Sequence, residues 1–160
     1  MTTRQLRVAA YGLCRNGENI LLARFISRER SERHWTLPGG KVEHSEDPID
    51  AVVRELAEET GYAVEVERLL GVDTRTKQVD RGAPGAMEIH HVGVFYSVRI
   101  TGGEIRYEVD GSTDLAEWVP LSKVPELERS VVIDIGLALE RSRPANGHVE
   151  PVTVGGLLRH

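Results

Sequence analysis

Residues Gly40 to Tyr62 read GKVEHSEDPIDAVVRELAEETGY, and this segment carries the strongest helix pattern in the chain. Asp47 is a favoured N-cap residue, and Pro48 stands at the first helical position, where its missing N–H costs nothing. Gly61 tolerates the left-handed conformation that ends many helices. The segment therefore predicts a helix that starts near Asp47, stops at Gly61 and lays one apolar stripe on a sheet, formed by Ile49, Val52, Val53 and Leu56.

Three glutamates of this helix, Glu55, Glu58 and Glu59, stand at positions i, i+3 and i+4 and project from one side of it. Their carboxylates repel each other, and the nearby cation at helical spacing is Arg54. A hard divalent cation such as Mg²⁺ or Mn²⁺ takes oxygen ligands and would relieve the repulsion. The alternative is a solvated acidic face, which is the commoner explanation of an isolated E-x-x-E-E pattern.

The residues around the glutamates favour the metal. Five residues separate Gly40 from Glu46, and seven more lead to the run from Arg54 to Tyr62. This pattern resembles the signature of the Nudix family, and the flank from Trp35 to Glu43 is similar to the strand and loop that precede it there. Two departures are mild: Tyr62 replaces a bulky aliphatic residue, and Ser45 stands where many members have Gly.

The resemblance implies an α+β fold, an α/β/α sandwich with a mixed central sheet, over roughly residues 5 to 142. It also implies metal ligands: Glu55, Glu58, Glu59 and the backbone carbonyl of Gly39. Arg54 would orient Glu58 or its neighbour by a charge-assisted hydrogen bond, and Glu46 would brace the loop.

The activity implied by the resemblance is hydrolysis of a phosphoanhydride bond in a nucleoside diphosphate linked to another group, with Mg²⁺ or Mn²⁺ as cofactor and a nucleoside or deoxynucleoside triphosphate as the favoured substrate. The general base is either Glu59 or a later loop carboxylate, Glu108 or Asp110, with Glu104 a weaker candidate. A nucleotide-sensing module without catalysis is the alternative function, and an isomerase of the same fold has less support.

Two residues outside the signature are candidates for substrate binding. Arg24 ends a predicted strand, where a cation would meet a phosphate or base, although a rim arginine is an equal alternative. Trp35 would stack on a base, although packing is its commoner role. His90 and His91 are adjacent in a strand and should point to opposite faces, so they cannot chelate one ion together. A loop cluster either steers polyphosphates or is merely solvated: Arg28, Arg30 and Arg33.

Local patterns predict the other elements. Strands at 6–14 and 19–24 are expected to form a hairpin around a turn at 15–18. Further strands are expected at 63–72, 89–100 and 115–120, with a loop at 80–85 and a polar turn at 109–114. A second helix is expected at 130–142, with four buried positions: Val131, Ile135, Leu137 and Leu139.

Composition is that of an ordinary globular domain. The 160 residues include 40% apolar and 28% charged side chains, which predicts one folded domain at 1–142 and a flexible tail at 143–160. A formal charge of −5 argues weakly against nucleic-acid binding. The single cysteine, Cys14, excludes an internal disulfide, and no apolar stretch is long enough for a signal peptide or a membrane span, so we expect a cytoplasmic protein. The sequence does not decide between a monomer and a homodimer.

Overall fold

A computed structural model describes residues 2–80, 85–152 and 157–158 of the chain. Its helices are α1 (Pro48–Thr60), η1 (Leu121–Glu126) and α2 (Val131–Ser142). One mixed sheet has the strand order β5 (Gly39–Lys41), β1 (Thr3–Leu13), β7 (Ala86–Gly103) and β6 (Tyr62–Asp80). The other runs β10 (Leu157–Leu158), β9 (Arg129–Ser130), β4 (Arg33–Thr36), β3 (Asn19–Ile26) and β2 (Arg15–Asn16), with β8 (Thr113–Pro120) beside β3. The expected α+β class is confirmed.

The ends of α1 lie where the sequence predicts them. The side chain of Asp47 accepts a hydrogen bond from the backbone N–H of Ile49 at 2.9 Å, and Gly61 ends the helix with φ of 81°. The predicted apolar stripe was wrong at Ile49, whose side chain is 45% exposed. The buried face instead follows Ala51, Val52 and Leu56 toward Glu59 at the C-terminal end, which leaves Ile49 at the solvent edge.

The predicted hairpin between strands 6–14 and 19–24 was wrong in its pairing. β1 pairs in parallel with β7 along its whole length and antiparallel with β5. Only the two residues of β2 pair with the start of β3. The chain therefore passes from one sheet to the other near Cys14. A turn pattern specifies the reversal of the chain, but the partner of a strand is set by distant residues.

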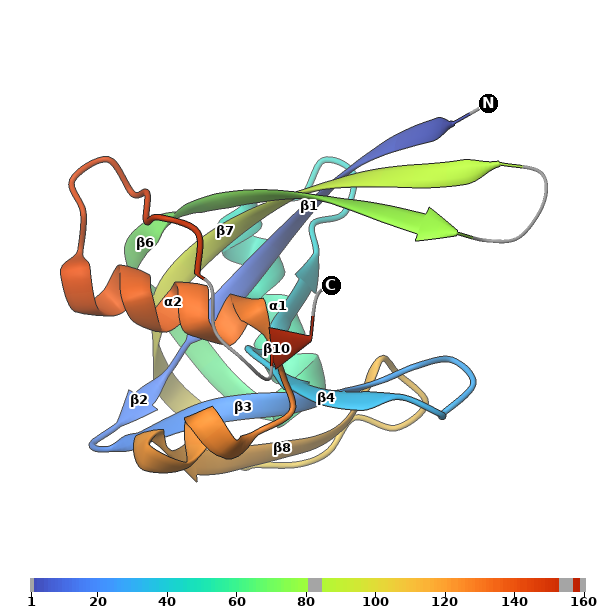
Figure 1. Cartoon of the computed structure of the whole chain (residues 1–160). Coiled ribbons are helices and arrows are strands. Elements are labelled where there is room, and N and C mark those ends of the chain that lie inside the picture. The colour runs from blue at the N-terminus through green and yellow to red at the C-terminus, as the bar shows by residue number, and fades with distance from the viewer. Residues whose placement is uncertain (1, 81–84, 153–156, 159–160) are drawn as a thin grey trace.

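The strands expected at 63–72 and 89–100 belong to a much longer hairpin. β6 has 19 residues and β7 has 18, and their pairing continues to Asp80 opposite Ala86. Of the loop expected at 80–85, residues 81–84 lie outside the described residues. Figure 1 shows the end of this hairpin, together with the start of β1, projecting beyond the rest of the fold.

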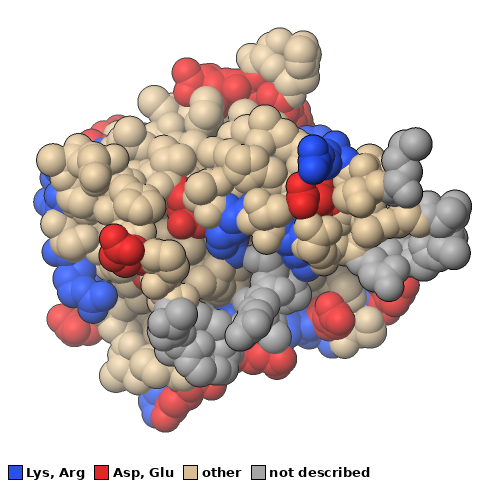
Figure 2. Space-filling model, turned by 45° about the horizontal axis from the view of Figure 1, so that its top comes forward, with Lys and Arg blue, Asp and Glu red and all other residues tan. Residues whose placement is uncertain are grey.

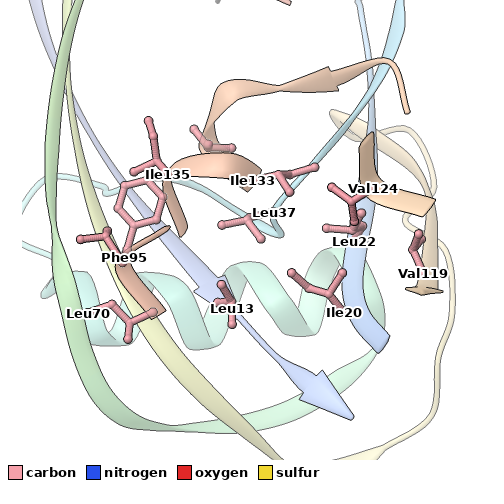
Figure 3. Close-up of a cluster of buried hydrophobic side chains, with 12 residues drawn as sticks. Leu13, Ile20, Leu22, Leu37, Leu70, Phe95, Val119, Val124, Ile133 and Ile135 are labelled. Carbon is pink, nitrogen blue, oxygen red and sulfur yellow. The ribbon is translucent and has the colours of Figure 1, made fainter. Parts of the chain in front are cut away.

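Two hydrophobic clusters lie on opposite faces of the sheet that contains β1. Leu13 and Phe95 pack against α2, as Figure 3 shows for the larger cluster. Ala10 and Tyr96 belong to the second cluster, which includes the buried face of α1. In α2 the predicted positions Ile135 and Leu139 are buried, while Val131 and Leu137 are only partly so. Val132 and Ile133, which were not predicted, are buried as well.

Part of the segment 143–160, expected to be a flexible tail, contacts the core. The carbonyl oxygen of Gly147 accepts a hydrogen bond from the backbone N–H of Val72 at 2.9 Å. Val149 and Val152 pack against the larger cluster, and β10 pairs in parallel with β9. A domain boundary at residue 142 stays a prediction. Among the described residues, no helix is long and apolar enough to cross a membrane.

Candidate active site

A cavity of about 440 Å³ lies beside the C-terminal half of α1. One end is formed by Glu55 and Glu59 of the helix and by Gly39 and Gly40 of β5. The other residues of its wall come from both sheets and from the loop before β8: Arg7, Tyr11, Phe25, His34, Thr36, Lys41, Arg75, Lys77, Val79, Ile89, His91, Ser112, Thr113 and Ser130.

Two glycines bring the backbone of β5 against the neighbouring groups. Gly39 has φ of 149°, and a Cβ there would collide with the carbonyl oxygen of Ala10. A Cβ on Gly40 would stand 2.7 Å from Oε1 of Glu55. A side chain at either position would displace a neighbour, so the glycines let the carboxylate of Glu55 lie directly on the strand.

Glu59 is a buried carboxylate at the acidic end of the cavity, only 2% exposed. Its Oε2 accepts a hydrogen bond from the backbone N–H of Gly39 at 2.9 Å. Burial raises the pKa of Glu59 well above its ordinary value, and the charges of Glu55, Glu108 and Glu58 raise it further. The pKa of Glu55 is also raised, chiefly by burial, with Arg54 opposing. A cation between them would relieve both conflicts.

Arg54 holds the acidic residues of the loop and the helix together. Its guanidinium donates two hydrogen bonds of 2.9 Å to the carboxylate of Glu46. Its Nη1 donates to Glu55 at 3.1 Å and to Glu58 at 3.4 Å. Glu46 also accepts from the backbone N–H of Glu43 at 3.1 Å, which ties the loop to the helix. Arg54 therefore contacts Glu58 and its neighbour Glu55, as expected from the sequence, and Glu46 as well.

The oxygen ligands suit a hard divalent cation, although their present positions are not yet those of a complete metal site. Within residues 2–80, 85–152 and 157–158, no group of three His, Cys, Asp or Glu side chains is close enough to share an ion. Glu55 and Glu59 face the same cavity, while the side chain of Glu58 is 49% exposed and bonded to Arg54. The chemistry of the carboxylates fits Mg²⁺ or Mn²⁺, and Glu58 would have to turn toward the cavity to join Glu55 and Glu59.

Of the three loop carboxylates, Glu108 is the one near the site. Its charge raises the pKa of both Glu55 and Glu59, and its Oε2 accepts hydrogen bonds from the N–H and the hydroxyl of Thr113, at 3.2 and 2.6 Å. Asp110 is exposed, with φ of 60°, and is not a main influence on either pKa. Glu104 is exposed too.

The comparison with protein families identifies the domain. Residues 3–135 match the model of the NUDIX domain, which is more than half of the chain.

The chain belongs to the Nudix family.

Both departures from the Nudix signature have a structural counterpart. Tyr62 accepts a hydrogen bond through its hydroxyl from the indole N–H of Trp118 at 3.2 Å, so its extra polar atom has a partner. Ser45 has φ of 65°, in the left-handed region where glycine is unstrained. The usual Gly there is thus explained by the backbone.

Curated Nudix relatives match over part of their length. The chain is 34% identical over 122 residues to the ADP-ribose pyrophosphatase of Methanocaldococcus jannaschii, covering 75% of this chain and 65% of the relative. It is 36% identical over 64 residues to the 8-oxo-dGTP diphosphatase of Proteus vulgaris, covering 40% of this chain and 57% of the relative. The chain thus spans less than two-thirds of either relative.

A solved structure supports the same fold. The NUDIX hydrolase from Nitrosomonas europaea superimposes with a TM-score of 0.73 at 18% identity, covering 89% of this chain and 93% of that one. At this identity the likeness shows the fold alone.

The structure does not place the two predicted substrate-binding residues in the cavity. Arg24 forms a bidentate pair with Asp114, with both hydrogen bonds at 2.9 Å. Its guanidinium lies 6.0 Å from the ring of Trp35, which packs against the larger hydrophobic cluster. Their strand neighbours Phe25 and His34 line the cavity instead, with ring centroids 4.8 Å apart. The alternation of side chains along a strand would have identified them had the pocket face been known.

The basic wall of the cavity was also missed from the sequence. Its residues on β1, β6 and β7 are separated in the chain and match no short motif: Arg7, Arg75, Lys77 and His91. The expectation that His90 and His91 point to opposite faces is confirmed, because His90 bonds Thr74 on the exposed face. Glu88 shares that face and bonds Gln78 at 2.6 Å.

On the face drawn in Figure 2, the Lys and Arg side chains of the described residues do not gather into one area. Figure 2 shows Lys and Arg side chains interspersed with Asp, Glu and uncharged residues on one face of the described chain. The Arg28, Arg30 and Arg33 cluster is exposed, and Arg33 pairs with Asp114 at 3.2 Å. This face therefore presents no continuous basic strip of the kind that follows a nucleic-acid backbone.

Proposed function

We propose that the chain hydrolyses a phosphoanhydride bond in a nucleoside diphosphate linked to another group, with Mg²⁺ or Mn²⁺ bound. The observation that carries the proposal is the pair Glu55 and Glu59 at one end of a cavity, beside the close-packed glycines of β5. The names of the relatives agree, since ADP-ribose and 8-oxo-dGTP both contain such a bond.

Three glutamates and one carbonyl would hold the metal: Glu55, Glu58, Glu59 and the carbonyl of Gly39. A divalent cation held there would supply charge neutralisation for the diphosphate and would lower the pKa of an attacking water. Arg54 would keep Glu55 and Glu58 in position through its hydrogen bonds to their carboxylates. The N–H of Gly39 fixes one oxygen of Glu59, which leaves the other oxygen for the metal or for a proton.

The proton of the attacking water needs an acceptor. Glu59 and Glu108 are the two candidates, and the charge of Glu108, which contributes to the raised pKa of Glu59, supports its being near. Glu108 is the stronger candidate if Glu59 is engaged as a metal ligand. Phe25 and His34 line the same cavity and would contact the rest of the substrate.

The names of the relatives do not indicate which class of nucleotide this chain prefers. One is named for ADP-ribose and one for 8-oxo-dGTP, so the preference for nucleoside or deoxynucleoside triphosphates is part of the proposal. Cytoplasmic location and association of two chains are proposals of the same kind.

The test is a panel of nucleotides incubated with Mg²⁺, with release of phosphate, pyrophosphate and nucleoside monophosphate measured for the wild type and Glu59→Gln. We expect release on at least one panel member and its loss in the variant. Glu65→Gln, at an exposed residue of β6, is the control for removal of a surface carboxylate. Tight nucleotide binding with no release by the wild type would contradict the proposal and favour the sensing module.

A further inference from the structure

A row of basic side chains crosses three adjacent strands in the wall of the cavity, away from the glutamates. Arg7 of β1 lies opposite His91 of β7, and His91 lies opposite Arg75 of β6. Residues directly opposite in neighbouring strands share a face of the sheet. Lys77 follows Arg75 by two residues and shares this face as well. All four line the cavity.

A positive charge on His91 is unfavourable here, because its directly opposite neighbours on both sides are arginines and like charges in opposite positions destabilise a sheet. The pKa of His91 is lowered to about 4, first by burial and then by the charges of Arg7, Arg75 and Lys77. Asp73 offsets part of the charge through an ion pair with Arg75 at 3.4 Å. In a chain with a net charge of −5, a concentration of cations in a cavity indicates an anionic ligand.

The basic row and the acidic end are separated by a length that one ligand can span. Gly39 pairs with Tyr11 of β1, four residues along that strand from Arg7. At the usual rise of a strand this places Arg7 about 13 Å along β1 from the acidic end. Between them the cavity is lined by Tyr11, whose ring covers Gly93 of β7. A sugar extending from a diphosphate at the acidic end would therefore point toward the basic row.

We propose that the basic row binds a second phosphate, carried by the substrate at a distance from the diphosphate that is cleaved. The preferred substrates are then diphosphates whose nucleoside bears its own phosphate. This inference rests on the proposed function, since it takes the acidic end as the place of cleavage. A neutral base would gain little from several positive charges, whereas a phosphate accepts charge-assisted hydrogen bonds from Arg and Lys.

The experiment uses pairs of compounds that differ by one ribose phosphate: NADP⁺ against NAD⁺, and coenzyme A against dephospho-coenzyme A. Dissociation constants are measured by calorimetry with Mg²⁺ on Glu59→Gln, and hydrolysis is followed on the wild type. We expect the phosphorylated member of each pair to bind on the order of tenfold more tightly at low salt, with the ratio falling as salt is added.

Two charge-removing variants locate the effect. Lys77→Gln and Arg7→Gln, each made in the Glu59→Gln background, are expected to bring the ratio of dissociation constants close to one. The matched controls in that background are Lys123→Gln, at an exposed lysine of η1, and Arg4→Gln, at an exposed arginine three residues before Arg7 in β1. They should keep the ratio. Thermal unfolding shows which variants are folded. If Arg7→Gln does not fold, the result for Lys77→Gln alone decides the test.

The outcomes separate this inference from the proposed function. Hydrolysis of both members with equal binding would overturn the second-phosphate site and leave the hydrolase proposal standing. A phosphate preference that depends on Lys77, with no hydrolysis of any nucleotide by the wild type, would support the site and overturn the hydrolase proposal. A loss of the ratio in the control variants as well would also overturn the site.

Discussion

The guanidinium of Arg54 and the carboxylate of Glu46 form a two-bond fork, with both hydrogen bonds 2.9 Å long. The fork joins the loop after β5 to the helix that carries the acidic residues, so the placement of Glu55 and Glu58 depends on a contact outside the metal ligands themselves. A lysine at position 54 could not form the same two parallel hydrogen bonds, because its ammonium group is a single point of charge.

The fork predicts a dependence of stability on pH. Hydrogen bonding to Arg54 lowers the pKa of Glu46 from about 4.5 to about 2. Because the folded-state pKa is depressed, the contribution of Glu46 is fully present above pH 4.5 and is lost as the pH falls toward 2. The thermal midpoints of the wild type and Glu46→Gln, measured from about pH 6 down to about pH 2.5, should therefore converge at the acid end. A constant difference over this range would contradict the pKa shift.

Gly40→Ala should damage metal binding more than folding. The new Cβ would stand 2.7 Å from Oε1 of Glu55, and the end of this flexible side chain can move at little cost in stability. We expect a thermal midpoint close to that of the wild type and an affinity for Mg²⁺ lower by about tenfold or more. Gly102→Ala is the control, since its Cβ would meet only Ala63, at 4.0 Å. Equal Mg²⁺ affinities in both variants would disprove the role of Gly40.

Glu108→Gln and Asp110→Asn distinguish the two loop candidates for the general base. The amide oxygen introduced by Glu108→Gln would still accept the hydrogen bonds from Thr113, but the amide could not take a proton from water. We expect kcat to fall about a hundredfold or more in Glu108→Gln and to change little in Asp110→Asn. A comparable rate in Glu108→Gln and wild type would assign the base to Glu59.

Cys14 should be inert in the folded protein. Its side chain is 2% exposed, and burial raises the pKa of the thiol to about 11. A disulfide reagent at about pH 8 should therefore react within the mixing time only after denaturant is added. Rapid reaction of the native protein would indicate that the segment between β1 and β2 opens readily.

The parts of the fold that could be predicted are those specified by neighbouring residues. The caps of α1 at Asp47 and Gly61 need only their own side chains and backbone, and both lie where expected. The pairing of β1 with β7 joins residues that are far apart in the chain, such as Leu6 and His90. No turn or cap pattern specifies such a pairing, which is why the hairpin assigned to β1 was wrong.

The candidate site, too, contains residues that a local sequence pattern specifies and residues that only the strand pairing brings to it. Glu55, Glu59 and the two glycines of β5 come from one contiguous segment, and its spacing brings them together at the cavity. Arg54 of the same segment bonds Glu55. The roles assigned to these residues stay predictions. Phe25 and Arg75 reach the cavity through strand register, which composition and periodicity do not determine. Arg24 and Trp35 were chosen for their chemistry, and the register turns both away from the cavity.

The contact between Gly147 and Val72 bears on how the protein is trimmed for crystallisation or fusion. An expression fragment ended at the family match, residue 135, would stop in the middle of α2. One ended at residue 142 would keep the helix but remove the carbonyl that receives the N–H of Val72, and it would strip Val149 and Val152 from the apolar cluster. If such a fragment were insoluble, the cause would be the loss of these contacts of residues 147–152, and not a defect in the fold of residues 3–135.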